Sequence, residues 1–314
     1  MHSNKVYDVA YIGNYTKDTI VSPAGVKYVD GGAVNYAAHA AARLGLKVAV
    51  ITRLAEEDYR VVDTLSQVGA DCFAVLTPHS TCVKLEYPTT NVDIRNLYVT
   101  STAGSFTVAE VELLNTRAAV IGTTLRGEVG PDVIRALRLK KLLLAADVQG
   151  FVRVLRGQSL VYEPWDEMEA VLACLDILKS DAVEAEFLTG ESNIRKAAQI
   201  FAGMGPDEVV LTHKDGVLVY AAGQFYEAGF YPQKLNGRSG RGDTCLGAYV
   251  AMRLSKPPSE ASIWAAAVTS LKMESLGPFN RSIQEVEELI FSKYRDGTVH
   301  QETAADQPSA GKGD

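Results

Sequence analysis

Short apolar runs alternate with amphipathic segments along most of the chain, and this rhythm is its strongest constraint on the fold. The amphipathic segments carry apolar residues at helical spacing, at 34–45, 59–69, 131–138 and 184–190. The apolar runs between them read as strands at 6–13, 47–53, 117–122, 141–147, 175–180 and 207–212. Strands that are apolar on both faces and separated by helices predict a mostly parallel sheet covered on both sides, a three-layer α/β/α fold. The order of the strands cannot be predicted from one sequence.

Two segments break this rhythm, at about 14–30 and 81–100. Both alternate polar and apolar residues and contain turn formers, as half-exposed antiparallel strands do. They predict a small sheet that projects from the main layer and is a candidate lid over a pocket. The alternative is an edge extension or dimerisation surface. The two are compatible, because a lid sheet can also pair between the subunits of a homodimer.

The chain reads as one domain rather than two. Its 314 residues are enough for one large α/β domain or two smaller ones, but no internal repeat and no linker rich in Pro, Gly or Ser divides it. We therefore predict a single domain over 1–296 with the two lid segments. Residues 297–314 lack aromatics and have few large apolar side chains, which predicts a disordered tail.

Charge and cysteine usage exclude several classes of function. The net charge is −7 with acids and bases mixed, which argues against a nucleic-acid or membrane-surface binder but not against a local pocket for a small anion. The four cysteines lack the spacing of a metal or redox motif, as expected for reduced thiols. There is neither a signal-peptide core nor a run of about 20 apolar residues. We expect a soluble, cytoplasmic protein.

The glycine-rich stretch 236–254, NGRSGRGDTCLGAYVAMRL, is the best candidate for a site. Apolar residues at helical spacing predict a helix through about Arg253, with Gly240 and Gly242 just before it. The first N–H groups of a helix lack internal partners and carry partial positive charge, and glycines let an anion approach them. Gly247, inside the helix, indicates a close neighbour or a ligand.

Asp243, at the opening of that helix, needs a separate explanation because a carboxylate repels a resting phosphate. It suits a reaction in which it accepts the proton of an attacking hydroxyl while backbone N–H groups hold a phosphoryl group. The alternative is an ordinary helix cap at Asp243 or Thr244. A dinucleotide loop is disfavoured because Cys245 stands where the last glycine belongs, and no phosphate-loop motif occurs. An adhesion signal at Arg-Gly-Asp is disfavoured because its aspartate opens a helix.

Four segments together resemble the ribokinase-like (PfkB) carbohydrate kinase family. The resemblance runs in order and at the expected spacing from about 6 to 295. The DVQG segment at 147–150 is typical of a branch of the family that includes inositol-kinase-like members. The segments are GRSGRGDTCLGA at 237–248, GGAVN at 31–35 followed by AARLG, KSDAVE at 179–184, and DVQG at 147–150.

The resemblance implies ATP-dependent, Mg²⁺-assisted phosphorylation of a hydroxyl on a sugar, an inositol-like polyol or a nucleoside. It makes Asp243 the general base and the backbone at Gly240, Arg241 and Gly242 the anion hole. The other implied sites are substrate binding at Asp18, Gly31 and Asn35, nucleotide binding at Thr212 and Gly216, and metal binding at Glu184 and Asp181. Taken alone, Asp18 could equally be a turn acid, Asn35 a helix cap and Glu184 a surface charge.

The chain departs from the family pattern at four places. Gly237 replaces an aspartate tied to monovalent-cation binding, so potassium activation is not implied here, and Asp181 replaces an asparagine. The nucleotide turn 212–216 is one residue short. Arg241 replaces a small residue, and we hypothesise that its guanidinium neutralises phosphate charge and partly substitutes for the missing cation; alternatively it points to solvent. These departures leave open a non-catalytic nucleotide or sugar sensor on the same fold.

Overall fold

The computed structural model describes residues 5–89 and 96–294, and the backbone of 302–303. The main sheet is parallel from β13 to β5, and β14, β15 and β16 continue it antiparallel. Its strands, in spatial order, are β16 (Glu302–Thr303), β15 (Gln224–Gly229), β14 (Gly216–Ala221), β13 (Glu208–Thr212), β12 (Ile177–Asp181), β9 (Leu143–Asp147), β8 (Thr116–Ile121), β1 (Tyr7–Ile12), β4 (Val48–Leu54) and β5 (Ala70–Leu76).

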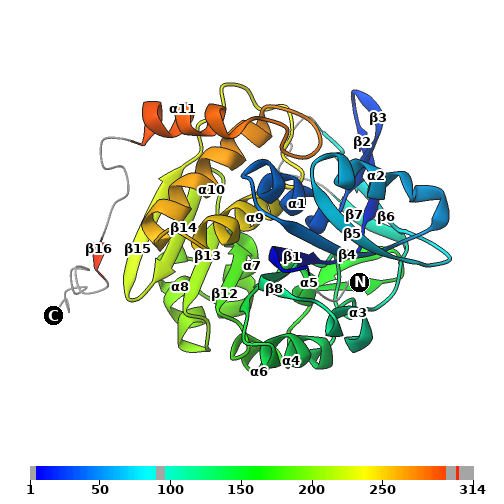
Figure 1. The fold of residues 1–314 in the computed structure, drawn as a ribbon, viewed down its shortest axis with the longest axis horizontal. Coiled ribbons are helices and arrows are strands. Elements are labelled where there is room, and N and C mark those ends of the chain that lie inside the picture. The colour runs from blue at the N-terminus through cyan, green and yellow to red at the C-terminus, as the bar shows by residue number, and fades with distance from the viewer. Residues whose placement is uncertain (1–4, 90–95, 295–301, 304–314) are drawn as a thin grey trace.

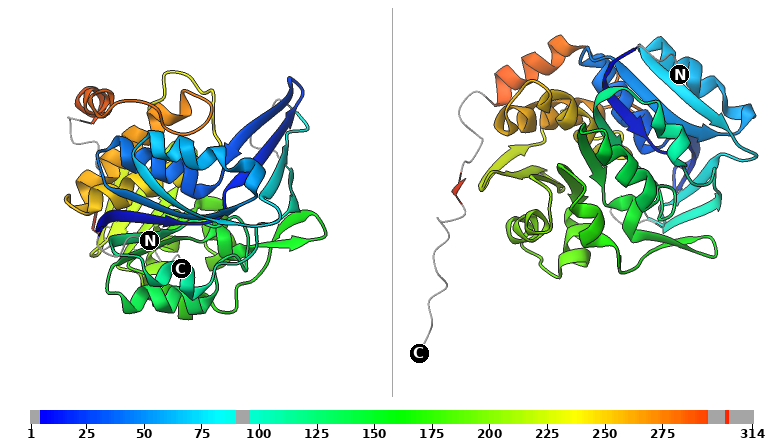
Figure 2. Two further views of the ribbon diagram at one scale, coloured as in Figure 1. Left: turned by 45° about the vertical axis from the view of Figure 1, so that its right-hand side comes forward. Right: turned by 60° about the horizontal axis from the view of Figure 1, so that its bottom comes forward.

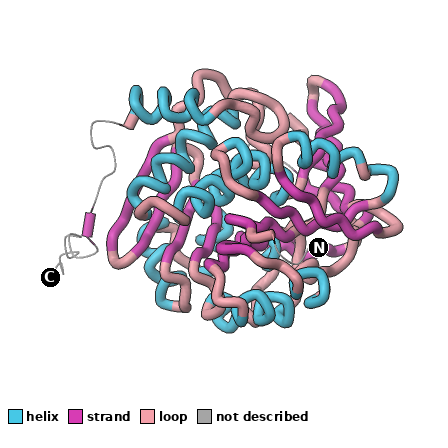
Figure 3. Tube along the Cα trace, in the orientation of Figure 1, coloured by secondary structure: helices cyan, strands magenta, loops and turns pink. Residues whose placement is uncertain are grey.

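Helices cover both faces of this sheet (Figures 1 and 3). One core packs against α1 (Ala33–Arg43), α2 (Arg60–Gln67), α9 (Arg241–Arg253), α10 (Pro258–Met273) and α11 (Ile283–Lys293). The other packs against α3 (Val108–Glu112), α4 (Pro131–Leu139), α6 (Met168–Leu172), α7 (Ala182–Thr189) and α8 (Ile194–Gly203). The predicted three-layer α/β/α fold is confirmed.

The strands are apolar on both faces because each core takes alternate residues. On β1, Val9 and Tyr11 belong to one core, whereas Ala10 and Ile12 belong to the other. All six predicted central strands form, with ends that differ by a few residues from the predicted ranges. None of the helices that the structure describes has the length and apolar character needed to cross a membrane.

A second, smaller sheet lies beside the main one and forms the lid (Figure 2). Its strands, in order, are β10 (Arg153–Arg156), β11 (Ser159–Tyr162), β7 (Asn96–Ser101), β6 (Thr81–Glu86), β2 (Thr16–Ser22) and β3 (Gly25–Gly31). Two outcomes differ from the sequence analysis: β2 and β6 pair in parallel, and the hairpin β10–β11 joins the sheet. The parallel pair arises because β6 follows β2 only after a long crossover through α1, β4 and β5.

The ends of the chain lie largely outside the described residues. The predicted disordered tail, 297–314, falls there except for Glu302–Thr303, which pair with Gln224–Phe225 of β15. Residues 90–95 of the second predicted lid segment also fall outside the described part.

The topology gathers polar residues at one edge of the main sheet. Register places Lys179 of β12 beside Asp147 of β9, and Asp181 of β12 beside Thr212 of β13. Because these parallel strands end together, their last side chains share the crevice at the carboxyl edge, where ligands bind in open α/β sheets.

Candidate active site

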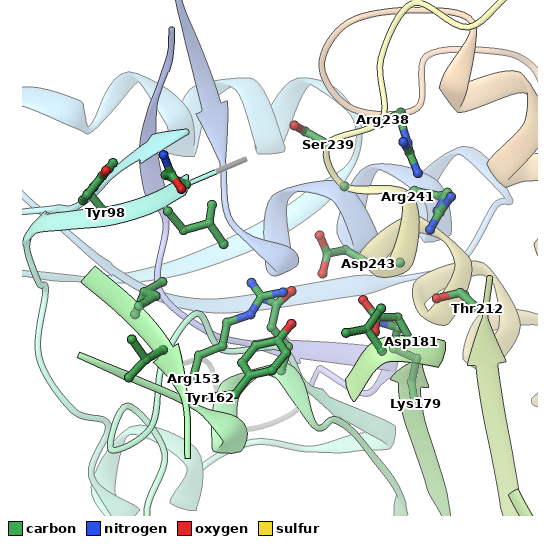
Figure 4. A pocket seen from close by; sticks show the side chains of 18 of the residues that line it. Tyr98, Arg153, Tyr162, Lys179, Asp181, Thr212, Arg238, Ser239, Arg241 and Asp243 are labelled. Atoms are coloured by element: carbon green, nitrogen blue, oxygen red, sulfur yellow. The ribbon is translucent and has the colours of Figure 1, made fainter. Parts of the chain in front are cut away.

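A cavity of about 750 Å³ lies between that sheet edge, the start of α9 and the lid (Figure 4). The α9 side contributes residues 238–243, and the lid contributes parts of β7, β10 and β11. The charged side chains that line it are Arg153, Lys179, Asp181, Arg238, Arg241 and Asp243.

Asp243 lies in the first turn of α9 and faces this cavity. The N-cap of the helix is Gly240, at φ 75°, so Asp243 is the third helical residue and does not occupy the capping position. Burial raises the pKa of the Asp243 carboxyl, the Asp147 carboxylate adds to the rise, and Lys179 opposes it. A carboxyl at a helix start with a raised pKa is suited to take a proton.

The two glycines beside Asp243 are required by close neighbours. A Cβ on Gly240 would lie 2.2 Å from Cδ1 of Tyr36, and one on Gly242 would lie 2.6 Å from Nζ of Lys179. The left-handed conformation of Gly240 is also one that a side chain would strain. Glycine therefore lets both the α1 side chain and the lysine ammonium approach the backbone that opens α9.

Gly247 has the close neighbour that the sequence analysis anticipated. A Cβ at this position would lie 2.7 Å from the Cα of Ala37, so α1 and α9 touch backbone to backbone here. The Tyr11 hydroxyl donates a hydrogen bond to the Gly247 carbonyl at 3.0 Å. The Gly247–Ala37 contact thus joins α1 directly to α9, and the Tyr11 hydrogen bond joins α9 to β1.

Gly237, the departure from the family's aspartate, also has a steric explanation. A Cβ there would lie 2.3 Å from the backbone oxygen of Ser275. The backbone of 236–237 is drawn in because the N–H groups of Asn236 and Gly237 both donate to the Met273 carbonyl, at 2.9 and 3.0 Å. An aspartate side chain does not fit in this arrangement.

Two buried ion pairs support the cavity floor. The Lys179 ammonium donates to Asp147 at 2.7 Å, and Arg153 Nη2 donates to Glu184 Oε1 at 3.1 Å. Burial lowers the pKa of Lys179, but the carboxylates around it outweigh burial and raise it, so the lysine stays charged. Arg153 Nε is buried and makes no hydrogen bond to any residue that the structure describes, which leaves a donor for a bound anion.

The predicted metal residues form a capping box at the start of α7. The Glu184 N–H donates to Asp181 Oδ1 at 2.8 Å, and the Asp181 N–H donates to Glu184 Oε2 at 3.2 Å. Glu184 is fully buried, burial raises its pKa to about 7, and Arg153 contacts its other oxygen. Asp181, in contrast, lines the cavity.

The residues at this site suit a magnesium ion only when the ion is also bound to a phosphate compound. Among the described residues, no group of three or more His, Cys, Asp or Glu side chains could hold a metal. Mg²⁺ commonly keeps several waters and binds through one or two carboxylates plus substrate phosphates. The donor set here, with Asp181 facing the cavity, suits a magnesium ion that is carried in on a phosphate compound.

Of the two predicted nucleotide residues, one lines the cavity and the other does not. Thr212 lines the cavity at the end of β13. Gly216 is buried at the start of β14, where a Cβ would lie 2.5 Å from the Ala228 oxygen, and its carbonyl accepts from the His213 N–H at 2.9 Å. The glycine therefore closes a tight hairpin and packs against β15, and it is not among the residues that line the cavity.

The predicted substrate residues lie together at the base of the lid. A Cβ on Gly31 would lie 2.3 Å from Asp18 Oδ2, and Asn35 Nδ2 donates to the Asp30 carbonyl at 3.0 Å. Asn35 Oδ1 is buried without a hydrogen-bond partner among the described residues. None of the three is among the residues that line the cavity.

Tyr36 connects this substrate group to the start of α9. Its ring lies against Gly240. Burial raises the pKa of the Tyr36 hydroxyl, and the carboxylates of Asp18 and Asp243 raise it further, so both carboxylates lie near it.

Comparison with known proteins identifies the family. The family model described as "pfkB family carbohydrate kinase" matches residues 1–284. The chain belongs to the PfkB carbohydrate kinase family. It is accordingly a kinase that transfers a phosphoryl group to an alcohol group, and this finding disfavours the non-catalytic sensor. No curated protein matched in a further comparison.

Solved structures with this kinase's fold fall into two groups. A pyrophosphate-dependent kinase of the ribokinase family, complexed with a pyrophosphate analog and myo-inositol, is 34% identical with a TM-score of 0.83, over 89% of this chain and 99% of that one. A pyrophosphate-dependent myo-inositol-1 kinase converted by mutation into a myo-inositol-3 kinase is also 34% identical, with a TM-score of 0.83, over 91% and 99%. Arabidopsis thaliana ribokinase, complexed with ribose and ATP, is 16% identical with a TM-score of 0.73, over 91% and 99%.

Three cationic residues of this PfkB kinase escaped the sequence analysis as site residues. Arg238 had a local signal, because it stands in the same glycine-rich stretch as Arg241. Lys179 opened a recognised motif, but its place beside Asp147 depends on strand register. Arg153 had no local signal, since it reaches the cavity only because the hairpin β10–β11 joins the lid sheet.

Proposed function

We propose that this kinase transfers a phosphoryl group from pyrophosphate to a hydroxyl of a cyclic polyol of the myo-inositol type. The observation that carries the proposal is the set of four cationic side chains around the start of α9: Arg153, Lys179, Arg238 and Arg241. Two of them, Lys179 and Arg153, are paired with the buried carboxylates of Asp147 and Glu184, whereas Arg238 and Arg241 add two further positive charges to the cavity lining. Pyrophosphate is small and densely charged and has no base or ribose for the protein to bind, so its binding depends on cationic side chains of this kind.

Arginine is well matched to an inorganic diphosphate. A guanidinium donates two parallel N–H bonds to phosphate oxygens, and such charge-assisted bonds are stronger than neutral ones. Arg238 and Arg241 lie on the α9 side of the cavity and Arg153 on the lid side, so a diphosphate bound between them would have guanidinium groups on both sides (Figure 4). Relatives about one third identical to this chain are described as pyrophosphate-dependent, which supports the same choice of donor.

The proposed reaction uses Asp243 as the base and the start of α9 as the anion hole. As the polyol oxygen attacks the nearer phosphorus, its O–H proton passes to the Asp243 carboxylate. The bond from the bridging oxygen to that phosphorus breaks, and inorganic phosphate leaves. The backbone N–H groups of Gly240 and Gly242 and the Lys179 ammonium stabilise the charge on the transferred group, whereas the Arg241 N–H donates to the Arg238 carbonyl at 3.2 Å. A magnesium ion, when bound at Asp181, would neutralise part of the diphosphate charge.

The acceptor is proposed to lie against Asp18, Gly31 and Asn35. A polyol hydroxyl can donate to Asp18 and to Asn35 Oδ1, the buried oxygen that has no partner among the residues that the structure describes. The exposed edge strand β3, which carries Val26 and Tyr28 at 54% and 79% exposure, supports the further proposal that the lid also pairs two copies of the chain. We propose residues 1–296 as one catalytic domain.

ATP is the second candidate donor, because Thr212 of the predicted nucleotide turn does line the cavity. The test is a matrix of donors and acceptors. Pyrophosphate and ATP, each with Mg²⁺, are combined with myo-inositol, ribose, fructose and a nucleoside, and phosphorylated product is measured by ³¹P NMR. We expect product from pyrophosphate and myo-inositol, formed at least about 100-fold more slowly by the Asp243→Asn variant. If product forms with ATP but not with pyrophosphate, the proposal of pyrophosphate as donor is wrong. If product forms only with an acceptor other than myo-inositol, the proposal of a polyol acceptor is wrong.

A further inference from the structure

Lys272 lies behind the glycine-rich loop and is not used by the reaction described above. It stands in the last turn of α10 and is 1% exposed. Its ammonium donates hydrogen bonds to the Gly237 carbonyl at 3.1 Å and to the Ser239 carbonyl. It also lies 5.0 Å from the ring centroid of Tyr36, the residue that packs on Gly240. One cation thus contacts both ends of the loop that leads into α9.

The same loop is held on α10 by its backbone. The N–H groups of Asn236 and Gly237 donate to the Met273 carbonyl, and Asn236 Nδ2 donates to the Glu274 carbonyl at 3.0 Å. These bonds use the loop's donors, whereas Lys272 takes its acceptors. The loop is therefore held on α10 through both its N–H groups and its carbonyl groups, and Lys272 is the only charged group in these contacts.

A buried ammonium without an acidic partner is unusual. Lys272 has no carboxylate within ion-pair distance in the part of the chain that the structure describes. Burial lowers its pKa to about 8, and the Asp243 carboxylate opposes that fall. Burying a charge in this way costs free energy that an apolar side chain would avoid, so the charge itself needs a purpose.

Peptide geometry indicates what the lysine does to the loop. In a trans peptide, the C=O of one residue and the N–H of the next point in opposite directions, and the described chain contains no cis bond. Because the Ser239 carbonyl points at Lys272, the Gly240 N–H points away from it. Gly240 lines the cavity, so an amide that points away from the lysine can face a phosphoryl group bound there.

We propose that Lys272 is a built-in cation that positions the anion hole, holding the carbonyls of Gly237 and Ser239 so that the Gly240 amide faces the transferred phosphoryl group. It is a positioning residue, because it acts through the loop and does not touch the reactants. The inference rests on the proposed phosphoryl transfer at Asp243. It implies that the enzyme needs no free monovalent cation, since backbone carbonyls that hold an ammonium are the ligands a potassium ion would use.

The test compares two substitutions at this position. Lys272→Met fills the space without charge, whereas Lys272→Ala leaves room for an ion. Lys293→Met is the matched control, because Lys293 also ends a helix and lies 5.9 Å from a tyrosine ring centroid but is exposed. Turnover with pyrophosphate, Mg²⁺ and myo-inositol is measured in tetramethylammonium chloride, then with potassium or ammonium chloride added. Melting followed by circular dichroism identifies variants that do not fold.

We expect the wild type and Lys293→Met to be insensitive to the added cation. Both Lys272 variants should lose turnover by about 100-fold, as expected when an oxyanion donor is misplaced, with little change in the KM for the polyol. Potassium or ammonium should restore Lys272→Ala by at least about tenfold and leave Lys272→Met low. Such rescue is a readout that a purely structural role would not produce.

Three outcomes would overturn the inference. These are a requirement of the wild type for potassium or ammonium, near-normal turnover of Lys272→Met, and a folded, inactive Lys272→Ala that no cation restores. The first outcome is measured on the wild type, so it tests the inference even if the variants fail to fold. If the wild type is inactive with every donor, the proposed function has failed instead. The inference is then tested by calorimetry of methylenediphosphonate binding, which Lys272→Ala should lose and potassium should restore.

Discussion

The Lys179 ammonium lies 2.7 Å from the Asp147 carboxylate, on strands that are neighbours in space but more than thirty residues apart in sequence. The pair matters because the same ammonium reaches the backbone of Gly242, where a Cβ would stand 2.6 Å from it. The sheet therefore delivers a fixed positive charge to the start of α9. It also leaves Asp243 next to a carboxylate that is already neutralised, so that burial remains the main reason for its raised pKa.

Replacing Asp243 with Asn should abolish most of the activity without loss of donor binding. General base catalysis is commonly worth about 100- to 10,000-fold, and the amide cannot accept the proton. Turnover and pyrophosphate binding are measured separately, with Asp63→Asn on the exposed face of α2 as the control. In the wild type, activity should fall as the pH drops through a pKa above the ordinary aspartate range, because the base must be ionised. Retention of normal turnover in Asp243→Asn would refute its role.

Removing the guanidinium of Arg241 or Arg238 should weaken binding of the donor rather than of the acceptor. A hydrogen bond to a charged group contributes about 1.5–3 kcal/mol, so the KM for pyrophosphate should rise by about 10- to 150-fold in Arg241→Ala. Steady-state kinetics with each substrate varied in turn checks this, and Arg43→Ala at the exposed end of α1 is the control. An unchanged KM for pyrophosphate in Arg241→Ala would contradict the hypothesis that this side chain neutralises phosphate charge.

Glu128 should make the protein less stable as the pH rises. Its carboxylate is buried, accepts bonds from the Thr124 N–H at 2.7 Å and Asn14 at 3.0 Å, and burial raises its pKa to about 7. The folded state therefore holds this proton more tightly than the unfolded state. The resulting stabilisation is complete below the unfolded pKa near 4.5 and is lost as the pH rises to about 7.

The measurement is the free energy of unfolding in urea at several pH values for wild type and Glu128→Gln. Between about pH 4.5 and pH 7 the wild type should lose up to about 3 kcal/mol more than the variant. Glu184, whose pKa is also raised to about 7, acts in the same direction in both proteins, so it cancels in the difference. Parallel curves for the two proteins would show that Glu128 does not titrate in this range.

Gly247→Ala should destabilise the protein although alanine favours helices. The added Cβ would lie 2.7 Å from the Ala37 Cα, and overpacking of this kind costs about 1–3 kcal/mol. Gly203→Ala is the matched control, because Gly203 ends α8 with no atom within 4 Å of its Cβ position and should gain up to about 1 kcal/mol. Urea unfolding compares the two. Equal effects would mean that α1 and α9 can separate at this point.

The three layers and the glycine-rich start of α9 could be predicted from local sequence patterns. The spacing of apolar residues and the residue types at helix ends both depend only on residues that are close in the sequence. The predicted end of α9 at about Arg253 matches the observed Arg253. Asp243, Arg241 and Asp181 were predicted as site residues, and all three side chains line the cavity. Their functional roles stay predictions.

What could not be predicted depends on contacts between distant segments. The hairpin β10–β11 joins the lid through Ser159 and Tyr98, a pairing that no local pattern specifies. The burial of Glu184 under Arg153 follows from that hairpin, so the surface charge that this residue suggests when it is taken alone is wrong. Lys272 was invisible for the same reason, because its partners lie more than thirty residues earlier in the chain.

The contact of Gly247 with Ala37 has a consequence for regioselectivity. It ties the helix that bears Asn35 to the helix that bears Asp243, which fixes the separation of the two groups. For the cyclic polyol proposed above, the attacking oxygen would then be chosen by how the acceptor ring is rotated in its site, and not by a change in the position of the base. Selection among the hydroxyls of one ring then falls to side chains on the lid strands, which can vary while the chemical apparatus stays the same.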